Sequence, residues 1–223
     1  MRKHLTFAAL AVMAWGIPFT AFALTCPAPQ PGFVRVKLID PAPQVTTGKS
    51  LKQINASAAG HGLVGKGKRA LGITESKLEA SINVNFAGQN LQRAQTKTTC
   101  VSVTRVNARF GHKELVVSLP REYYQGTCKF NVVYRHEMAH VDVARRTVRK
   151  YASVLRRELE HEVQKNNPMN ARTMKVGTAA YQKRLQAVVS SVGKRFEAEA
   201  NALHAKIDAP GSAYAANGAC QGW

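Results

Sequence analysis

The chain has 223 residues, of which 45% are hydrophobic, so it is long and apolar enough for one domain with a packed core. Its 32 Lys and Arg against 13 Asp and Glu give a formal net charge of +19, which favours polyanionic surroundings such as cell-wall polymer, anionic lipid or lipopolysaccharide. The basic residues are not interleaved with aromatic residues and no nucleic-acid fold motif is visible, which argues against a specific nucleic-acid partner.

Residues 1–23 have the features of a secretory signal peptide. A basic start is followed by an apolar run over residues 5–20 and by the small-x-small sequence Ala21-Phe22-Ala23. The run is shorter than the roughly 20 residues of a membrane-spanning helix, and no later apolar stretch reaches that length. We therefore expect one exported domain, residues 24–223, that is periplasmic or secreted, has no transmembrane segment and carries a net charge of +17 from 30 basic and 13 acidic residues.

The mature chain would contain four cysteines, Cys26, Cys100, Cys128 and Cys220. An even number in an exported chain predicts disulfide bonds, and three connectivities are possible. We favour Cys100–Cys128, which would tie a predicted strand to the loop before the histidine-bearing helix and stabilise the fold by about 3–4 kcal/mol. Cys26–Cys220 would then join the two tails.

The first half of the mature chain predicts short strands and loops. Residues 24–52 are rich in proline and irregular, apart from one alternating stretch at 34–38. Residues 57–68 are rich in Gly and Ala and indicate a loop, whereas residues 81–86 alternate again and indicate a strand.

The second half predicts a hairpin followed by two long helices. Residues 100–109 and 114–119 alternate as two strands joined at Gly111-His112-Lys113. Apolar residues then recur at helical spacing over about 130–164 and about 178–207. The expected fold class is therefore α+β, with a small antiparallel sheet packed against two long helices.

The first long helix contains His136-Glu137-Met138-Ala139-His140, an H-E-x-x-H signature. Positions i and i+4 of a helix lie one above the other, so His136 and His140 project from one face and can hold a single Zn²⁺. In such sites the metal lowers the pKa of its bound water to roughly 7 and the glutamate takes the proton. Glu137 is therefore the predicted general base.

A catalytic zinc needs a third protein ligand. Position 146, where the metzincin extension would require histidine, is arginine, which excludes that class. The second long helix contains Glu197-Ala198-Glu199-Ala200-Asn201, which resembles the E-x-x-A-D or E-x-E-A-N pattern of gluzincin-type families. That resemblance implies Glu197 as the third ligand and Asn201 as a residue that orients a ligand histidine, with Glu199 as the alternative ligand.

His204 lies seven residues after Glu197 and thus on the same helix face. It is a further candidate ligand or a hydrogen-bond donor to the transition state. Tyr181 and Tyr134 are additional candidates for stabilising the oxyanion.

From about residue 72 onward the chain is similar to a family of predicted secreted bacterial zinc proteases. Besides the signal peptide, the similarity lies in the predicted hairpin that ends in Val117-Ser118-Leu119-Pro120, the cysteine before the helix, the H-E-x-x-H followed by valine, and a tail that ends in a Gly-rich turn. It implies a secreted zinc metallopeptidase that acts on a protein or peptide substrate. The alternative is a non-catalytic, strongly basic protein that binds the cell wall or envelope, with a structural metal or none; the retained Glu137 favours the enzyme.

Overall fold

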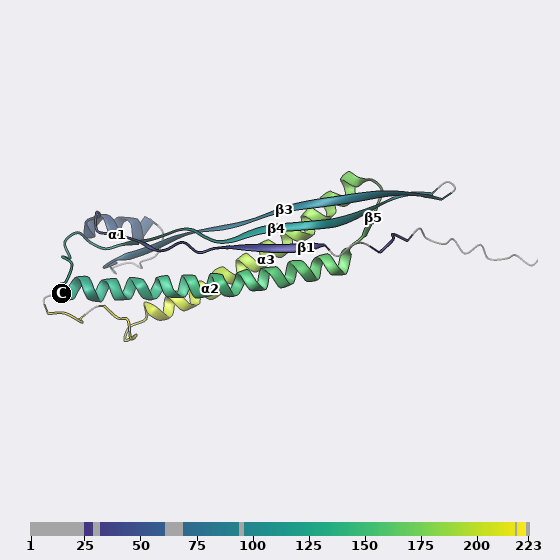
Figure 1. The fold of residues 1–223 in the computed structure, drawn as a ribbon. Coiled ribbons are helices and arrows are strands. Elements are labelled where there is room, and N and C mark those ends of the chain that lie inside the picture. Colours follow the sequence, from purple (N-terminus) through teal and green to yellow (C-terminus); the bar gives the residue numbers. More distant parts are fainter. Residues whose placement is uncertain (1–24, 29–31, 61–68, 94–95, 217, 222–223) are drawn as a thin grey trace, which may run out of the picture.

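The structure is a computed structural model that describes residues 25–28, 32–60, 69–93, 96–216 and 218–221. The predicted signal peptide, residues 1–23, lies outside the described residues. The molecule is elongated, with a sheet and two long helices that extend along the same direction (Figure 1). In chain order the elements are β1 (Phe33–Ile39), β2 (Gln44–Thr46), α1 (Leu51–Gly60), β3 (Ile73–Arg93), β4 (Thr96–Ser118), α2 (Cys128–Asn166), β5 (Met169–Ala171) and α3 (Met174–Ile207).

These elements confirm the α+β class, but the sheet is mixed and the prediction of an antiparallel sheet is wrong. One edge of β4 pairs with the antiparallel β3, and its other edge pairs in turn with the antiparallel β5 and the parallel β1 and β2. The chain leaves β2 through α1 and returns along β3, so β4 runs in the same direction as β1. The strands predicted at 34–38 and 81–86 lie within β1 and β3.

The predicted hairpin with a turn at residues 111–113 is also wrong. Residues 100–109 and 114–119 do not form two strands, because β4 continues through the predicted turn to Ser118. Gly111 lies inside this strand with φ +152°, and a Cβ atom there would be 1.9 Å from the backbone oxygen of Ile39. The glycine thus permits a close approach of β1 to β4, a role that resembles a turn signal when only the sequence is read.

A bulge in β4 keeps its apolar residues on one face. Asn85 of β3 is paired with Arg105 and Phe86 is paired with Val103, so Thr104 is an extra residue between them. The bulge reverses the alternation, and the apolar residues on both sides of it face the helices. These residues are Val101, Val103, Val106, Ala108 and Phe110, all buried.

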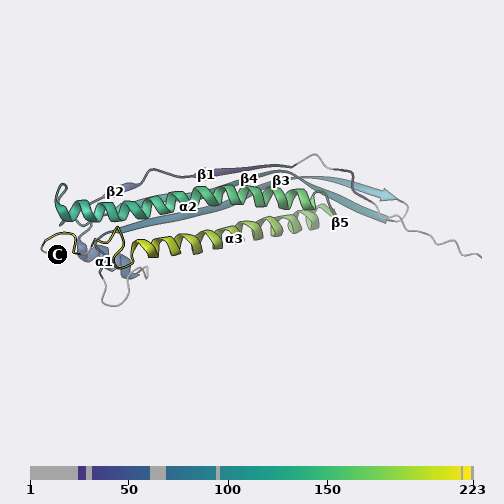
Figure 2. The ribbon, with the colours of Figure 1, turned by 90° about the horizontal axis from the view of Figure 1, so that it is seen from below.

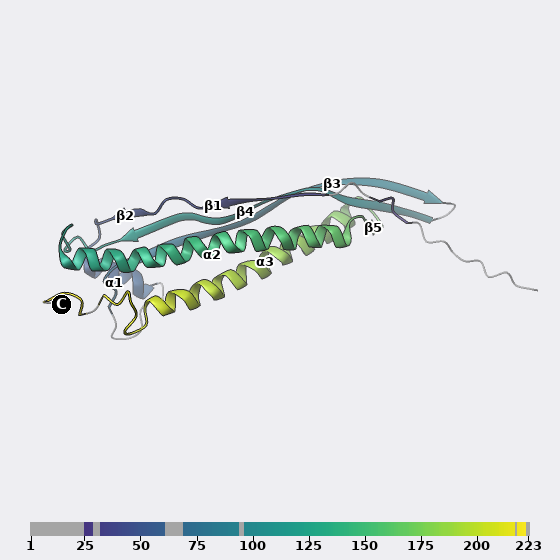
Figure 3. The ribbon, with the colours of Figure 1, turned by 60° about the horizontal axis from the view of Figure 1, so that its bottom comes forward.

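The helices α2 and α3 lie antiparallel on one face of the sheet (Figures 2 and 3). Each begins after a threonine whose side chain caps the first turn: Thr127 accepts a hydrogen bond from the Phe130 amide, and Thr173 accepts one from Val176. Their apolar stripes form the main core with the sheet. The ranges predicted as helical, 130–164 and 178–207, lie inside α2 and α3.

The loop predicted for residues 57–68 is replaced in part by a helix. Residues 57–60 belong to α1, which buries Ile54 and Ala58 against Ile73 of β3. Residues 61–68 lie outside the described residues. In the part of the chain that the structure describes, no helix is both long and apolar enough to cross a membrane.

Four cysteines form two disulfides, but the favoured connectivity is wrong. Cys26 is bonded to Cys100 and Cys128 to Cys220. Cys100 is paired with β5, directly after the end of α2, whereas Cys128 begins α2. The two are therefore separated by most of the length of a 39-residue helix, about 58 Å at 1.5 Å per residue. Each disulfide instead ties one terminal segment to the nearest end of the molecule.

Candidate metal centre

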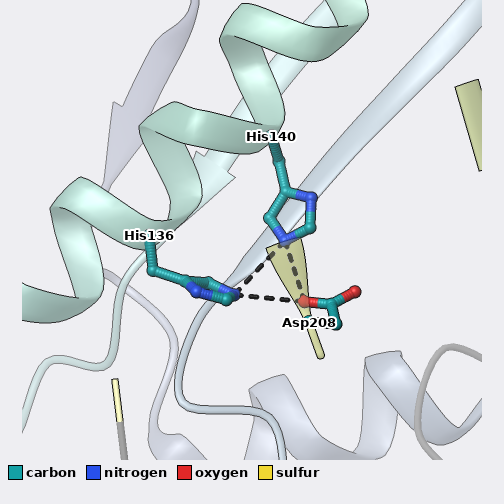
Figure 4. Close-up of side chains that lie close together, drawn as sticks. All are labelled: His136, His140 and Asp208. Atoms are coloured by element: carbon teal, nitrogen blue, oxygen red, sulfur yellow. Dashed lines mark hydrogen bonds and ion pairs between the residues drawn. The ribbon is translucent and has the colours of Figure 1, made fainter. Parts of the chain in front are cut away.

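The antiparallel helices bring an early turn of α2 to the C-terminal end of α3. His136 and His140 project from one face of α2 toward Asp208, the residue that follows α3 (Figure 4). Oδ1 of Asp208 lies 3.2 Å from Nε2 of His136 and 3.1 Å from Nε2 of His140. The two Nε2 atoms are themselves 3.2 Å apart. Three donor atoms therefore form a nearly equilateral triangle.

This triangle has the dimensions of one face of a tetrahedral zinc site. Zinc lies about 2.0–2.1 Å from histidine nitrogen and carboxylate oxygen, so the ligand atoms of a tetrahedron are about 3.3–3.4 Å apart. The observed separations of 3.1–3.2 Å need only a small expansion. Two imidazoles and one carboxylate also match the ligands of catalytic zinc sites, which leave the fourth position open. Among the described residues, His136, His140 and Asp208 form the group able to hold a metal ion.

The C-terminal tail orients the first histidine. Nδ1 of His136 donates a hydrogen bond to the backbone oxygen of Tyr214 at 2.9 Å, which leaves Nε2 as the ring nitrogen that faces Asp208. The Cys128–Cys220 disulfide holds this tail against the beginning of α2. Burial lowers the pKa of His136, but the bonds to Asp208 and to the Tyr214 backbone outweigh it and raise the pKa overall.

A histidine of α3, His204, contacts the ring of His140. Nδ1 of His140 and Nδ1 of His204 lie 2.9 Å apart, so one ring donates a proton and the other accepts it. His204 belongs to the last turn of α3. Burial, together with the positive charge that His140 can carry, lowers the pKa of His204 to about 4. A neutral His204 can accept the Nδ1 proton of His140 and thereby leave Nε2 free for a metal.

Asp208 is ionised at neutral pH. Burial alone would raise its pKa, but the hydrogen bonds from His136 and His140 outweigh that effect and hold the pKa well below its usual range. An anionic carboxylate beside two imidazoles is the protonation state that binds a divalent cation.

Glu137 points from the same helix turn toward the start of β3. Its side chain is only 4% exposed, and its Oε2 accepts a hydrogen bond of 2.7 Å from Oγ1 of Thr74. A Cβ atom at Gly72 would lie 2.7 Å from the other carboxylate oxygen, Oε1. Burial raises the pKa of Glu137, while Thr74 and the positive charges of the nearby histidines oppose that rise. A raised pKa suits a carboxyl group that takes up and returns a proton near neutrality.

The structure does not bring Glu197 or Glu199 to the histidines. Glu199 accepts hydrogen bonds from Lys150 and Tyr151. Lys150 is ten residues beyond His140 on α2, about 15 Å along the helix axis. Glu197 is exposed and lies still further from the end of α3. The carboxylate that the structure places beside the two histidines is therefore Asp208 and not Glu197, the ligand implied by the sequence resemblance.

Of the other residues predicted for the site, one contacts a candidate ligand and the rest do not. His204, predicted as a ligand or a donor to the transition state, instead contacts the ring of His140, and Asn201, predicted to orient a ligand histidine, is exposed on α3. Tyr181 is buried and donates a hydrogen bond to the Asn166 backbone at the opposite end of α2, which removes it from the site. Tyr134 is on α2 two residues before His136, but it is partly exposed and stacks on Phe130.

One sequence signal could have indicated Asp208. A carboxylate at the C-terminal end of a helix is unfavourable, because that end carries partial negative charge. An aspartate directly after Ile207 and before Pro210-Gly211 therefore contributes little to ending the helix and has to be explained by a partner elsewhere. That signal suggests a partner without naming the histidines.

Comparison of the chain with protein-family models, with curated proteins and with solved structures finds no match. Only the geometry of these side chains therefore supports a metal site here.

We predict that the purified protein retains about one zinc ion per chain after dialysis. His140→Ala and Asp208→Asn should weaken zinc binding by more than the roughly 10–100-fold that a supporting hydrogen bond contributes, because each removes a donor atom. Glu197→Gln and Glu199→Gln are matched controls that remove a carboxylate from α3 and should keep the metal. Metal analysis by mass spectrometry checks this. Zinc loss in Glu197→Gln with retention in Asp208→Asn would restore the assignment from the sequence.

The lowered pKa of His204 predicts a pH-dependent stability of the metal-free protein. The unfolded ring takes a proton near pH 6.5 and the folded ring near pH 4, so the stabilising contribution is complete above 6.5 and is lost as the pH falls toward 4. Across that interval the wild type should lose roughly 1–2 kcal/mol more than His204→Gln, after allowance for the partial exposure of the ring. Denaturant unfolding at a series of pH values measures the difference; parallel curves would contradict it.

Proposed function

We propose that the protein is an exported zinc-dependent hydrolase that cleaves peptide bonds. The observation that carries this proposal is the donor triangle of His136, His140 and Asp208, with Glu137 on the same helix turn. The dimensions of the triangle support zinc, and the retained glutamate supports catalysis, because a purely structural metal has no need of a base. The two disulfides are compatible with export to an oxidising compartment.

When bound, zinc would supply Lewis acidity toward the scissile carbonyl and toward the attacking water. Glu137 would accept the proton of that water on Oε1, since Oε2 is already held by Thr74. It would then deliver the proton to the leaving amine. The Thr74 contact fixes the side-chain rotamer of Glu137, so the base does not need to be ordered when substrate binds.

A peptide substrate is supported by the strand next to the site. Among the described residues, β3 pairs only with β4, so its second edge presents backbone donors and acceptors. The first residues of this strand include Thr74, the partner of Glu137. An extended peptide added along that edge would be aligned by backbone hydrogen bonds near the base.

We predict that Glu137→Gln keeps zinc and loses hydrolysis. The amide has the volume of the carboxylate but cannot take a proton, so cleavage of an unfolded protein such as casein should fall by about 10²–10⁴. Glu160→Gln, on an exposed turn of the same helix, is the matched control and should behave as the wild type. If the zinc-loaded wild type cleaves neither casein nor cell-wall peptide, the metal is structural and the hydrolase proposal is abandoned.

Gly72→Ala tests the position of the base without changing its chemistry. The added methyl group would approach Oε1 of Glu137 to 2.7 Å and Cγ1 of Val133 to 2.8 Å, so the carboxylate would have to move. A displacement of that kind can reduce the rate by on the order of 10²-fold. Gly193→Ala, where a Cβ meets nothing within 4 Å, is the control. Equal rates for the two variants, at equal zinc content, would show that Glu137 does not act from its observed position.

A further inference from the structure

The face of the sheet opposite the helices carries a regular basic surface. Three neighbouring strands contribute three exposed residues each, and their registers place these residues in rows across the sheet. Residues paired across strands project from the same face. We call this surface the basic platform; its rows are Phe33, Arg105 and Asn85, then Arg35, Asn107 and Asn83, then Lys37, Arg109 and Ser81.

The basic platform has four cations and no carboxylate. Arg109 donates a hydrogen bond to Glu79, which lies just beyond the last row. Within the part of the chain that the structure describes, Arg35, Lys37 and Arg105 have no ionic partner. Successive rows are about 6.6–6.8 Å apart and neighbouring strands about 4.7–4.9 Å apart, so the unpaired cations lie close together on one face of the sheet.

The helix face of the molecule differs in its charge arrangement. There, some of the exposed cations form ion pairs with carboxylates. One ion pair lies within α2, and three join α2 to α3. The first is Arg156–Glu160, and the others are Lys150–Glu199, Arg184–Glu162 and Arg195–Glu158. Other exposed cations of α3, such as Lys175, Lys183 and Lys194, have no ion pair among the described residues, so uncompensated positive charge is not confined to the sheet. The basic platform differs in that its residues stand in rows set by the strand register and include no carboxylate.

We propose that the basic platform binds an acidic polysaccharide. Guanidinium groups pair with sugar carboxylates through two parallel hydrogen bonds. The asparagine amides and the serine hydroxyl, which both donate and accept, match the hydroxyl groups between those charges. Phe33, 57% exposed at one corner, offers an apolar face to a sugar ring.

The same residues disfavour two other polyanions. Single-stranded nucleic acid is bound by successive aromatic side chains on which bases stack, and the platform has only Phe33. A membrane surface is bound by cations together with apolar side chains that enter the lipid, and the central row is entirely polar. The platform is also separate from the metal centre: Ser81 lies seven residues along β3 from Thr74, about 23 Å. The inference does not depend on the hydrolase proposal.

The test compares two triple variants of the full mature chain that lose the same charge. Arg35→Gln/Lys37→Gln/Arg105→Gln removes three platform cations, and Lys175→Gln/Lys183→Gln/Lys194→Gln removes three exposed cations from α3. Binding to alginate, a linear polyuronate, is measured by titration calorimetry at several salt concentrations, with neutral pullulan as the reference polymer. The platform variant should bind alginate about ten-fold more weakly and with a smaller salt dependence, whereas the α3 variant should stay within about two-fold of the wild type.

A neutral variant separates a built surface from general attraction. Asn107→Ala removes the central amide without changing the net charge, and it should also weaken alginate binding. The proposal is overturned if both triple variants weaken binding equally, if Asn107→Ala has no effect, or if the wild type does not bind alginate. It is also overturned if an oligodeoxythymidine or phosphatidylglycerol vesicles bind the platform more tightly than alginate does. Unchanged circular dichroism confirms that each variant is folded.

Discussion

The antiparallel packing of α2 and α3 against one face of the sheet is the constraint on which the candidate site depends. It sets the early turns of α2 against the last turn of α3, so that His136 and His140 meet Asp208. A shift of one residue along the helix axis is about 1.5 Å, roughly three times the positional tolerance of about 0.5 Å for a functional site. The core contacts that fix this register, such as Phe110 against Phe196, lie well away from the donor atoms.

The supporting contacts around the donors come from three separate parts of the chain. The tail after α3 holds His136 through the Tyr214 backbone, the last turn of α3 holds His140 through His204, and β3 holds Glu137 through Thr74. The two histidines and Glu137 thus have their orientation set by a second group before any metal binds. The Cys128–Cys220 disulfide secures the tail that carries Tyr214, so a bond that persists in an oxidising compartment also helps to orient His136.

Strand β3 links the two functional surfaces that we propose. Its first residues contact the base of the candidate metal centre, and its middle contributes Ser81, Asn83 and Asn85 to the basic platform. The alternation of a strand permits this, since residues of one parity face the helices and those of the other face solvent. Anchoring through the basic platform would keep the proposed hydrolytic site close to substrates in the same polymer-rich surroundings.

Local patterns in the sequence determined the helices, the α+β class and the pair of histidines with its glutamate, because these depend on spacings within one turn or one strand. The wider arrangement could not be read in the same way. Asp208 lies 68 residues from His140, and its contact depends on how two helices pack. Gly111 indicates a turn by its identity, yet it serves a close approach of β1 that no local pattern reveals. The cysteine pairing likewise depends on the elongated shape of the folded molecule. Cys100 and Cys128 lie near opposite ends of α2, and each is bonded to the terminal segment at its own end.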